Sequence, residues 1–287
     1  MQNLSASEVT GGLSPSSLSM FLSCNRKYFH KKIAKDQPDA DADLDTRPFM
    51  VGKAFHKVLE DCRHELGGVK LAKIMETCQS FDLDEDESIM VGAMLSKYKA
   101  VHEAAGLKAI ACEIEIKTEK FHGFVDVILQ GPVGWWIADM KTAASYNPAI
   151  LPALPSNLQL NLYAAHAAVV AELGGLDLKA FRGCRYRVTT KSKLIRKTTE
   201  TVPSYFARVA QAVKSFDFAI PVEMLKTENI LDMHIEAFKH IQKKKKATQY
   251  PKNLGNCMNY NKPCEYFSKC HGFNFTAAPT LEVVQAL

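Results

Sequence analysis

Two short apolar runs joined by a tight turn place the strongest limit on how this chain folds. The first run carries Asp126, the second carries Asp139 and Lys141, and a turn at Gly131–Pro132 separates them. Apolar runs of this length bounded by turn residues predict a pair of strands. Because side chains two residues apart on a strand share a face, we expect Asp139 and Lys141 on one side, where Asp126 joins them if the strands pair.

The surroundings of these charges indicate a ligand. Two carboxylates and an ammonium among valine, isoleucine and tryptophan side chains are costly to desolvate unless a metal ion or a phosphate binds between them. The pattern therefore predicts a divalent-metal site that acts on phosphodiesters.

A histidine and a glutamine–tyrosine pair flank this region at compatible positions. His56 lies in the helix-like segment that begins at Gly52, and it is either a metal ligand or a partly exposed helix histidine. Gln159 and Tyr163 are four residues apart, so a helix places both on one face. There they reach a DNA backbone or support the lysine, unless they belong to an ordinary amphipathic helix.

An alternating segment precedes the Asp126 run and carries two more acids. Alternation predicts a strand with Glu113 and Glu115 on the same face. Both face solvent, or Glu113 belongs to the site.

Three cysteines gather in a loop-rich C-terminal segment. Cys257, Cys264 and Cys270 follow the spacing Cys-x6-Cys-x5-Cys, and a fourth ligand is available in Cys24, on a helix that begins at Ser14–Pro15. Four cysteines can hold a structural zinc ion, and unrelated free thiols are the other interpretation. The remaining four cysteines are expected to be small core residues: Cys62, Cys78, Cys112 and Cys184.

Composition limits the class of protein. Hydrophobic residues make up 47% of the 287, which is ample for a core, and no run approaches the ~20 apolar residues of a membrane span. The N-terminus lacks a signal-peptide profile. Eight cysteines in such a chain indicate metal ligands and reduced thiols instead of a disulfide scaffold. We expect a cytoplasmic protein with no membrane partner.

Basic residues are unevenly distributed within the net charge of +5. Residues 179–200 contain eight basic residues and one acidic residue, and Arg185 and Arg187 share a face of a predicted strand. Such a stripe is typical of a groove that follows phosphates, and we expect residues 182–197 to contact them. A second basic run at residues 243–246 fits a solvated helix end.

The pattern along the chain predicts an α/β fold. Helices are expected from residue 14 to about 105, interrupted by a loop at 36–47 and by Gly67–Gly68. Three strands follow at 109–141, then a helix at 156–172, strands at 180–190 and 194–201, and helices at 203–218 and 227–245.

Taken together, these motifs resemble the PD-(D/E)xK nuclease superfamily, in its RecB/AddB-like and CRISPR-associated iron–sulfur exonuclease branch. The resemblance implies a restriction-endonuclease-like core, a mixed central sheet flanked by helices, with an N-terminal helical part and a C-terminal Cys-rich Fe–S tail. The expected segments are a disordered N-terminus at 1–13, a helical region at 14–107, a nuclease core at 108–202, C-terminal helices with the cysteine tail at 203–275, and a tail at 276–287.

The resemblance also implies roles for individual residues. The metal, Mg²⁺ or Mn²⁺, is bound by His56, Asp126, Asp139 and the Met140 carbonyl. Catalysis is carried by Asp126, Asp139, Lys141, Gln159 and Tyr163. A [4Fe-4S] cluster is held by Cys24, Cys257, Cys264 and Cys270, although the commonest family spacing is Cys-x2-Cys-x5-Cys.

The implied activity is a metal-dependent DNA exonuclease, acting on single strands or strand ends in recombination, repair or phage DNA processing in a bacterial or phage-infected cell. The chain carries no G-x-x-x-x-G-K-[ST] motif, so unwinding requires a helicase or recombination partner. The alternative is an accessory DNA-binding or assembly subunit on the same fold, as in CRISPR adaptation.

Overall fold

The computed structural model describes residues 12–39, 47–63, 71–244, 246–259 and 262–271. The chain forms two compact units: a sheet unit, Asp45–Met233, and a terminal unit that joins Met1–Leu44 to His234–Leu287. Most of the expected disordered N-terminus and the whole expected tail at 276–287 lie outside the described residues, as do residues 40–46 and Gly67–Gly68.

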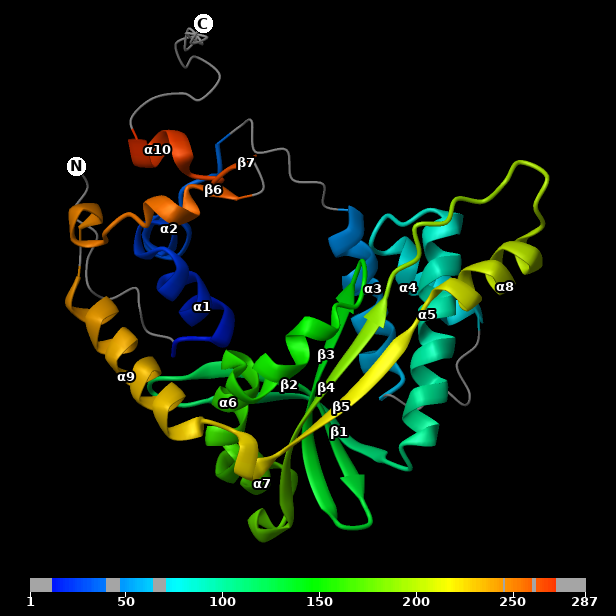
Figure 1. Cartoon of the computed structure of the whole chain (residues 1–287), viewed down its shortest axis with the longest axis horizontal. Coiled ribbons are helices and arrows are strands. Elements are labelled where there is room, and N and C mark those ends of the chain that lie inside the picture. The colour runs from blue at the N-terminus through cyan, green and yellow to red at the C-terminus, as the bar shows by residue number, and fades with distance from the viewer. Residues whose placement is uncertain (1–11, 40–46, 64–70, 245, 260–261, 272–287) are drawn as a thin grey trace, which may run out of the picture. The chain divides into compact units, whose positions relative to one another are not determined.

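The sheet unit is built on a mixed sheet whose described strands run in the order β1-β2-β3-β4-β5 (Figure 1). β3 and β4 are parallel, and the other neighbouring pairs are antiparallel. The strands are β1 (Lys108–Lys117), β2 (His122–Gly131), β3 (Gly134–Ala143), β4 (Phe181–Thr190) and β5 (Ser215–Pro221). The predicted α/β class and mixed sheet are confirmed.

Helices cover both faces of this sheet. α3, α4, α5 and α8 pack together and bury Val127, Leu129, Ala138 and Met140 in a shared core, whereas α6 and α7 lie on the opposite side (Figure 1). The helices of the unit are α3 (Arg47–Asp61), α4 (Leu71–Gln79), α5 (Glu85–Ala104), η4 (Pro148–Ser156), α6 (Leu158–Ala165), α7 (Ala167–Gly174), η5 (Leu178–Ala180), α8 (Val202–Ala212), η6 (Val222–Met224) and the start of α9 (Thr227–Lys243).

Local sequence explains the ends of several elements. The acidic run at residues 82–87 begins α5: the Asp84 carboxylate accepts the Glu87 N–H at 2.8 Å, and the Glu87 carboxylate accepts the Asp84 N–H at 2.9 Å. This reciprocal cap satisfies backbone groups that a helix start leaves free. Gly134 closes the β2–β3 turn with a φ of 143°, and a side chain there would collide with the Ala180 carbonyl.

Two sequence predictions after β4 are wrong. The strand expected at 194–201 is a loop, in which Ile195 is 82% exposed and Arg196 binds the Glu85 and Asp86 carboxylates at 2.6 and 3.0 Å. The helix expected at 203–218 ends at Ala212, and the last strand begins at Ser215. β5 begins shortly after the helix ends. In the sequence, its alternating apolar residues can therefore be mistaken for a continuation of the helical pattern.

The terminal unit brings the two ends of the described chain together. The Arg26 side chain donates to the Tyr250 carbonyl at 2.8 Å, and Lys31 pairs with Glu265 at 3.0 Å. Its elements are α1 (Pro15–Ser23), α2 (Asn25–Tyr28), the π-helical turn η2 (Phe29–Ile33), the end of α9, η7 (Ala247–Gln249), η8 (Leu254–Asn256), β6 (Met258–Asn259), β7 (Lys262–Pro263) and α10 (Phe267–His271). Among the described helices of the chain, none has the length and apolar character needed to cross a membrane.

Candidate active site

The site begins where β2 and β3 stop pairing. Their backbone register runs from Gly131 opposite Gly134 to Val127 opposite Ala138. One residue further, the Asp126 carboxylate accepts the Met140 N–H at 2.6 Å and so takes the place of a strand partner. Asp126 is thereby fixed at the opening between the two strands, next to the Asp139 segment, as the sequence predicted.

A chain of hydrogen bonds holds Lys141. Its Nζ donates to Asp139 Oδ1 at 2.7 Å and to Gln159 Oε1 at 3.0 Å. Gln159 Nε2 donates to Tyr163 Oη at 3.0 Å, and Tyr163 Oη donates to the Phe124 carbonyl at 2.5 Å. The predicted shared faces of Asp139 with Lys141, and of Gln159 with Tyr163, are confirmed. This series of hydrogen bonds links β3, α6 and β2, so the position of the Lys141 ammonium depends on three elements.

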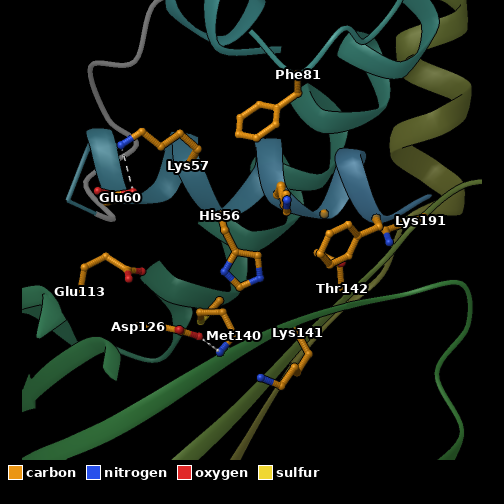
Figure 2. Close-up of a pocket in the computed structure, with 13 residues that line it drawn as sticks. His56, Lys57, Glu60, Phe81, Glu113, Asp126, Met140, Lys141, Thr142 and Lys191 are labelled. Atoms are coloured by element: carbon orange, nitrogen blue, oxygen red, sulfur yellow. Dashed lines mark hydrogen bonds and ion pairs between the residues drawn. The ribbon is translucent and has the colours of Figure 1, made fainter. Parts of the chain in front are cut away.

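A pocket of about 560 Å³ opens beside this network (Figure 2). His56, Asp126, Met140 and Lys141 line it, and Figure 2 shows the His56 ring pointing from α3 toward Asp126 and Met140. Gly52, one turn before His56, makes this approach possible, because a Cβ there would lie 2.7 Å from Thr142 Oγ1. The glycine therefore lets α3 come close to β3 and carry His56 to the acids.

Glu113 is also part of the pocket. It lies on β1 with a φ of 49°, an uncommon backbone conformation for a residue other than glycine. Partial burial, then Asp126 and Glu60, raise the pKa of Glu113 to about 7. Because the Glu113 carboxyl remains accessible to water, solvent screening keeps the effect of this pKa shift on the free energy of folding small. Glu115 instead lies 2.9 Å from the His122 ring, so of the two acids left open by the sequence, Glu113 is the one that lines the pocket.

Burial shifts the remaining ionisable groups away from their usual behaviour. The pKa of Asp139 is raised to about 6 by burial and by Asp126, against the lowering effect of Lys141. Burial also raises the pKa of Asp126. The pKa of His56 is lowered to about 4 by burial and then by Lys141, so the imidazole is neutral at pH 7 and able to coordinate a metal.

These donors suit a hard divalent cation. Asp139 is 1% exposed, and its Oδ2 has no hydrogen-bond partner within the described chain, an unusual state for a buried carboxylate oxygen. Carboxylate oxygens and a neutral imidazole are ligands for Mg²⁺ or Mn²⁺. In the described residues, no three His, Cys, Asp or Glu side chains already surround a common point, so binding requires them to turn toward the ion.

Several pocket residues were missing from the predicted site. Glu60 lies four residues after His56, on the same face of α3, and this spacing was a signal available in the sequence. Phe49, Lys53 and Lys57 lie on the same helix, and Thr142 follows Lys141 on β3. Phe81 and Lys191 reach the pocket from other segments, which spacing along the chain does not indicate.

The predicted phosphate-binding stripe at residues 182–197 is wrong in its central part. Arg187 is 1% exposed, and its guanidinium donates to the Asp217 carboxylate at 2.7 and 3.0 Å and to Tyr98 Oη at 3.0 Å. Arg185 binds the same aspartate at 2.8 Å. The two arginines do share a face, as predicted, but it is the face packed against α5, where they neutralise a buried acid instead of reaching DNA.

The four tail-associated cysteines all lie in the terminal unit. Cys24 is 8% exposed and caps α2, and the Cys264 N–H donates to the Cys257 carbonyl at 2.8 Å. Burial and then Cys264 and Cys24 raise the pKa of Cys270 to about 11, and burial, Cys24 and Cys264 raise that of Cys257. All four cysteines thus belong to one unit, although within the described residues no three of them surround a common point. Of the other cysteines, Cys78 and Cys184 are buried, whereas Cys62 and Cys112 are half-buried.

Comparison with known proteins agrees with this geometry. The family model of the PD-(D/E)XK nuclease superfamily matches residues 12–271, from just before α1 to the end of α10. No curated protein matches the chain significantly. The match spans the sheet, the Asp126–Asp139–Lys141 site and all four tail-associated cysteines, and the chain therefore belongs to the PD-(D/E)XK nuclease superfamily.

Proposed function

We propose that this protein is a metal-dependent DNA exonuclease that acts on single strands or strand ends in recombination, repair or phage DNA processing. The observation that carries the proposal is the bonded network of Asp139, Lys141, Gln159 and Tyr163 beside a pocket that also receives Asp126 and His56. Membership of the superfamily supports phosphodiester hydrolysis as the reaction.

Each side chain has a definite task in this hydrolysis. A water oxygen forms a bond to phosphorus, the bond from phosphorus to the leaving sugar oxygen breaks, and the leaving oxygen gains a proton. Burial lowers the pKa of Lys141, but Asp139 and Asp126 outweigh it and keep the ammonium charged. That fixed charge positions the water or stabilises negative charge on the five-coordinate phosphate. Gln159 and Tyr163 hold the ammonium in place.

The metal site in this proposal consists of His56, Asp126, Asp139 and the Met140 carbonyl. A bound Mg²⁺ or Mn²⁺ would lower the pKa of a water and offset phosphate charge. Three features of the chain support these ligands: the partnerless Asp139 Oδ2, the neutral His56 ring and the opening at Asp126. An imidazole ligand suits Mn²⁺ somewhat better than Mg²⁺.

A [4Fe-4S] cluster on Cys24, Cys257, Cys264 and Cys270 is the second part of the proposal, with structural zinc as the alternative. The placement of all four cysteines in the terminal unit and the bonds between the chain ends support a shared ligand that joins them. Anaerobically purified protein should absorb near 400 nm and contain iron and sulfide, and Cys24→Ser should remove most of both. A colourless, zinc-containing protein would establish the alternative.

The nuclease proposal is tested by cleavage of end-labelled single-stranded DNA with Mn²⁺. Asp139→Ala and Lys141→Ala should abolish cleavage while leaving folding and iron content unchanged. Lys99→Ala is the matched control, because Lys99 pairs with Glu103 at 3.0 Å on the surface of α5 and does not line the pocket. Equal cleavage by all four proteins would refute the site. Tight DNA binding without cleavage by the parent would instead favour an accessory subunit.

A further inference from the structure

Three aromatic side chains stack beside the site, at the open edge of the sheet. The Tyr146 ring lies 4.2 Å from the Phe216 ring and 5.6 Å from the Phe218 ring, with interplanar angles of 29° and 20°. The two phenylalanine rings are nearly parallel to each other, at 10°. All three are half-buried, and β5, which carries Phe216 and Phe218, is the last strand of the sheet. We call these residues the aromatic edge.

The aromatic edge lies on the same face of the sheet as the catalytic lysine. Asp217, between the two phenylalanines, points toward α5, where Arg187 joins it to Tyr98. Neighbouring side chains on a strand point to opposite faces, so Phe216 and Phe218 point away from α5. Lys141 is on that same side, because it bonds to Gln159 of α6.

The strand register aligns the aromatic edge with the site. Across β3, β4 and β5, Lys141 pairs with Val188 and Val188 with Phe216. Two residues before Lys141 on β3, Asp139 pairs with Tyr186, and Tyr186 pairs with Phe218. Two strand spacings separate the ends of each row, a distance of about 10 Å. This distance corresponds to about three nucleotide steps along one strand of a duplex, and to fewer steps along an extended single strand.

The space beside Phe218 is accessible and lined mainly by apolar residues, with Asp217 as the charged exception. A pocket of about 260 Å³ adjoins Phe218 and is lined by Leu151, Pro155 and Met224. Leu151 and Met224 are 36% and 48% exposed. Four lysines line the catalytic pocket instead: Lys53, Lys57, Lys141 and Lys191. Apolar rings next to a lysine-rich pocket match a ligand with flat apolar groups on a phosphate backbone.

We propose that Tyr146, Phe216 and Phe218 stack against unpaired bases of the DNA strand whose scissile phosphate lies at Lys141. Base stacking on aromatic rings tolerates any sequence, because every base has a flat π-face. A paired duplex keeps its bases stacked on one another and offers them no access to these rings. This inference rests on the proposed nuclease function and deepens it by assigning the contact with unpaired bases to three named side chains.

The test measures DNA binding without cleavage. In the Asp139→Ala background with EDTA, binding of a single-stranded oligonucleotide containing 2-aminopurine is followed by fluorescence. Phe216→Leu and Tyr146→Leu should each weaken binding by about tenfold and reduce the change in base fluorescence. Binding of a blunt duplex should change less. Phe216→Trp should restore single-strand binding, and Phe206→Leu, an exposed aromatic on α8, should leave it unchanged.

The outcomes separate this inference from the nuclease proposal. Unchanged single-strand binding by Phe216→Leu and Tyr146→Leu, together with normal Mn²⁺-dependent cleavage by the otherwise native protein, would refute the stacking role and leave the nuclease intact. Equal weakening by Phe206→Leu, or failure of Phe216→Trp to restore binding, would assign the loss to general packing and also refute it. A native protein that neither binds nor cuts DNA would refute both.

Discussion

Gly52→Ala tests whether close packing of α3 on β3 positions His56. Replacing a glycine inside a helix by alanine normally stabilises a protein by about 1 kcal/mol. At Gly52 the added Cβ would lie 2.7 Å from Thr142 Oγ1, and an overpacked contact of this kind costs about 1–3 kcal/mol. The two effects oppose each other, so we expect the variant to range from unchanged to about 2 kcal/mol less stable.

Thr142→Ala removes the atom responsible for the clash. In that background the same Gly52→Ala change should stabilise the protein by about 1 kcal/mol. The coupling between the two positions should therefore be about 1–3 kcal/mol, measured by urea unfolding of the two single variants, the double variant and the parent. Cleavage should fall in Gly52→Ala, because His56 moves with the helix, and recover in the double variant.

Gly92→Ala is the matched control in another helix. A Cβ at Gly92 would lie 3.6 Å from a Phe206 ring carbon, an ordinary contact, so this variant should gain about 1 kcal/mol in either background. Coupling between Gly52 and Thr142 below about 0.5 kcal/mol would show that α3 is not pressed against β3. The account of how His56 reaches the acids would then be wrong.

Three further predictions concern the bonded network, the ionisable acids and the buried arginine. Tyr163→Phe leaves the Phe124 carbonyl without its partner, so it should cost about 1–3 kcal/mol of stability in urea unfolding and lower kcat at least about tenfold with little change in KM; an unchanged kcat would contradict the positioning role. The pKa of Asp139 is raised from its ordinary 3.8 to about 6. This residue therefore contributes its full stabilisation of the folded state below pH 3.8, and the metal-free protein should lose that stabilisation as the pH rises toward and through 6. Mn²⁺ should reverse the loss. A stability profile that rises over this pH window, and that Asp139→Asn leaves unaltered, would contradict the role given to Asp139. Arg187→Met leaves Asp217 with Arg185 alone and should cost about 3–5 kcal/mol without changing the salt dependence of DNA binding; a stable variant with weakened DNA binding would restore the phosphate-binding interpretation.

The placement of the site side chains could be predicted because its signals are local. Asp139 and Lys141 are two residues apart on a strand, and Gln159 and Tyr163 are four apart on a helix, so periodicity alone fixes their relative directions. The short turn at Gly131–Pro132 makes the strands pair, and pairing brings Asp126 to Met140.

Features that depend on long-range pairing were not predictable. The sequence predicts a surface charge at Arg187, because its partner Asp217 is thirty residues away. Asp217 lies on a strand that the sequence pattern assigned to a helix. The aromatic edge was missed for the same reason, since Phe216 and Phe218 alternate only if that segment is extended. The sequence could not separate Glu113 from Glu115, because the alternating pattern does not reveal the positive φ at Glu113.

The most direct test of the central claim is a Mn²⁺ titration of the chelator-treated protein in the absence of DNA, followed by electron paramagnetic resonance. The account predicts a Mn²⁺ site that Asp126→Asn, Asp139→Ala and His56→Ala each weaken or remove, and that Glu115→Ala, on the same strand as Glu113 but paired with His122, leaves intact. Mn²⁺ binding that is the same in the parent and in all of these variants would show that the pocket beside Lys141 is not the metal site.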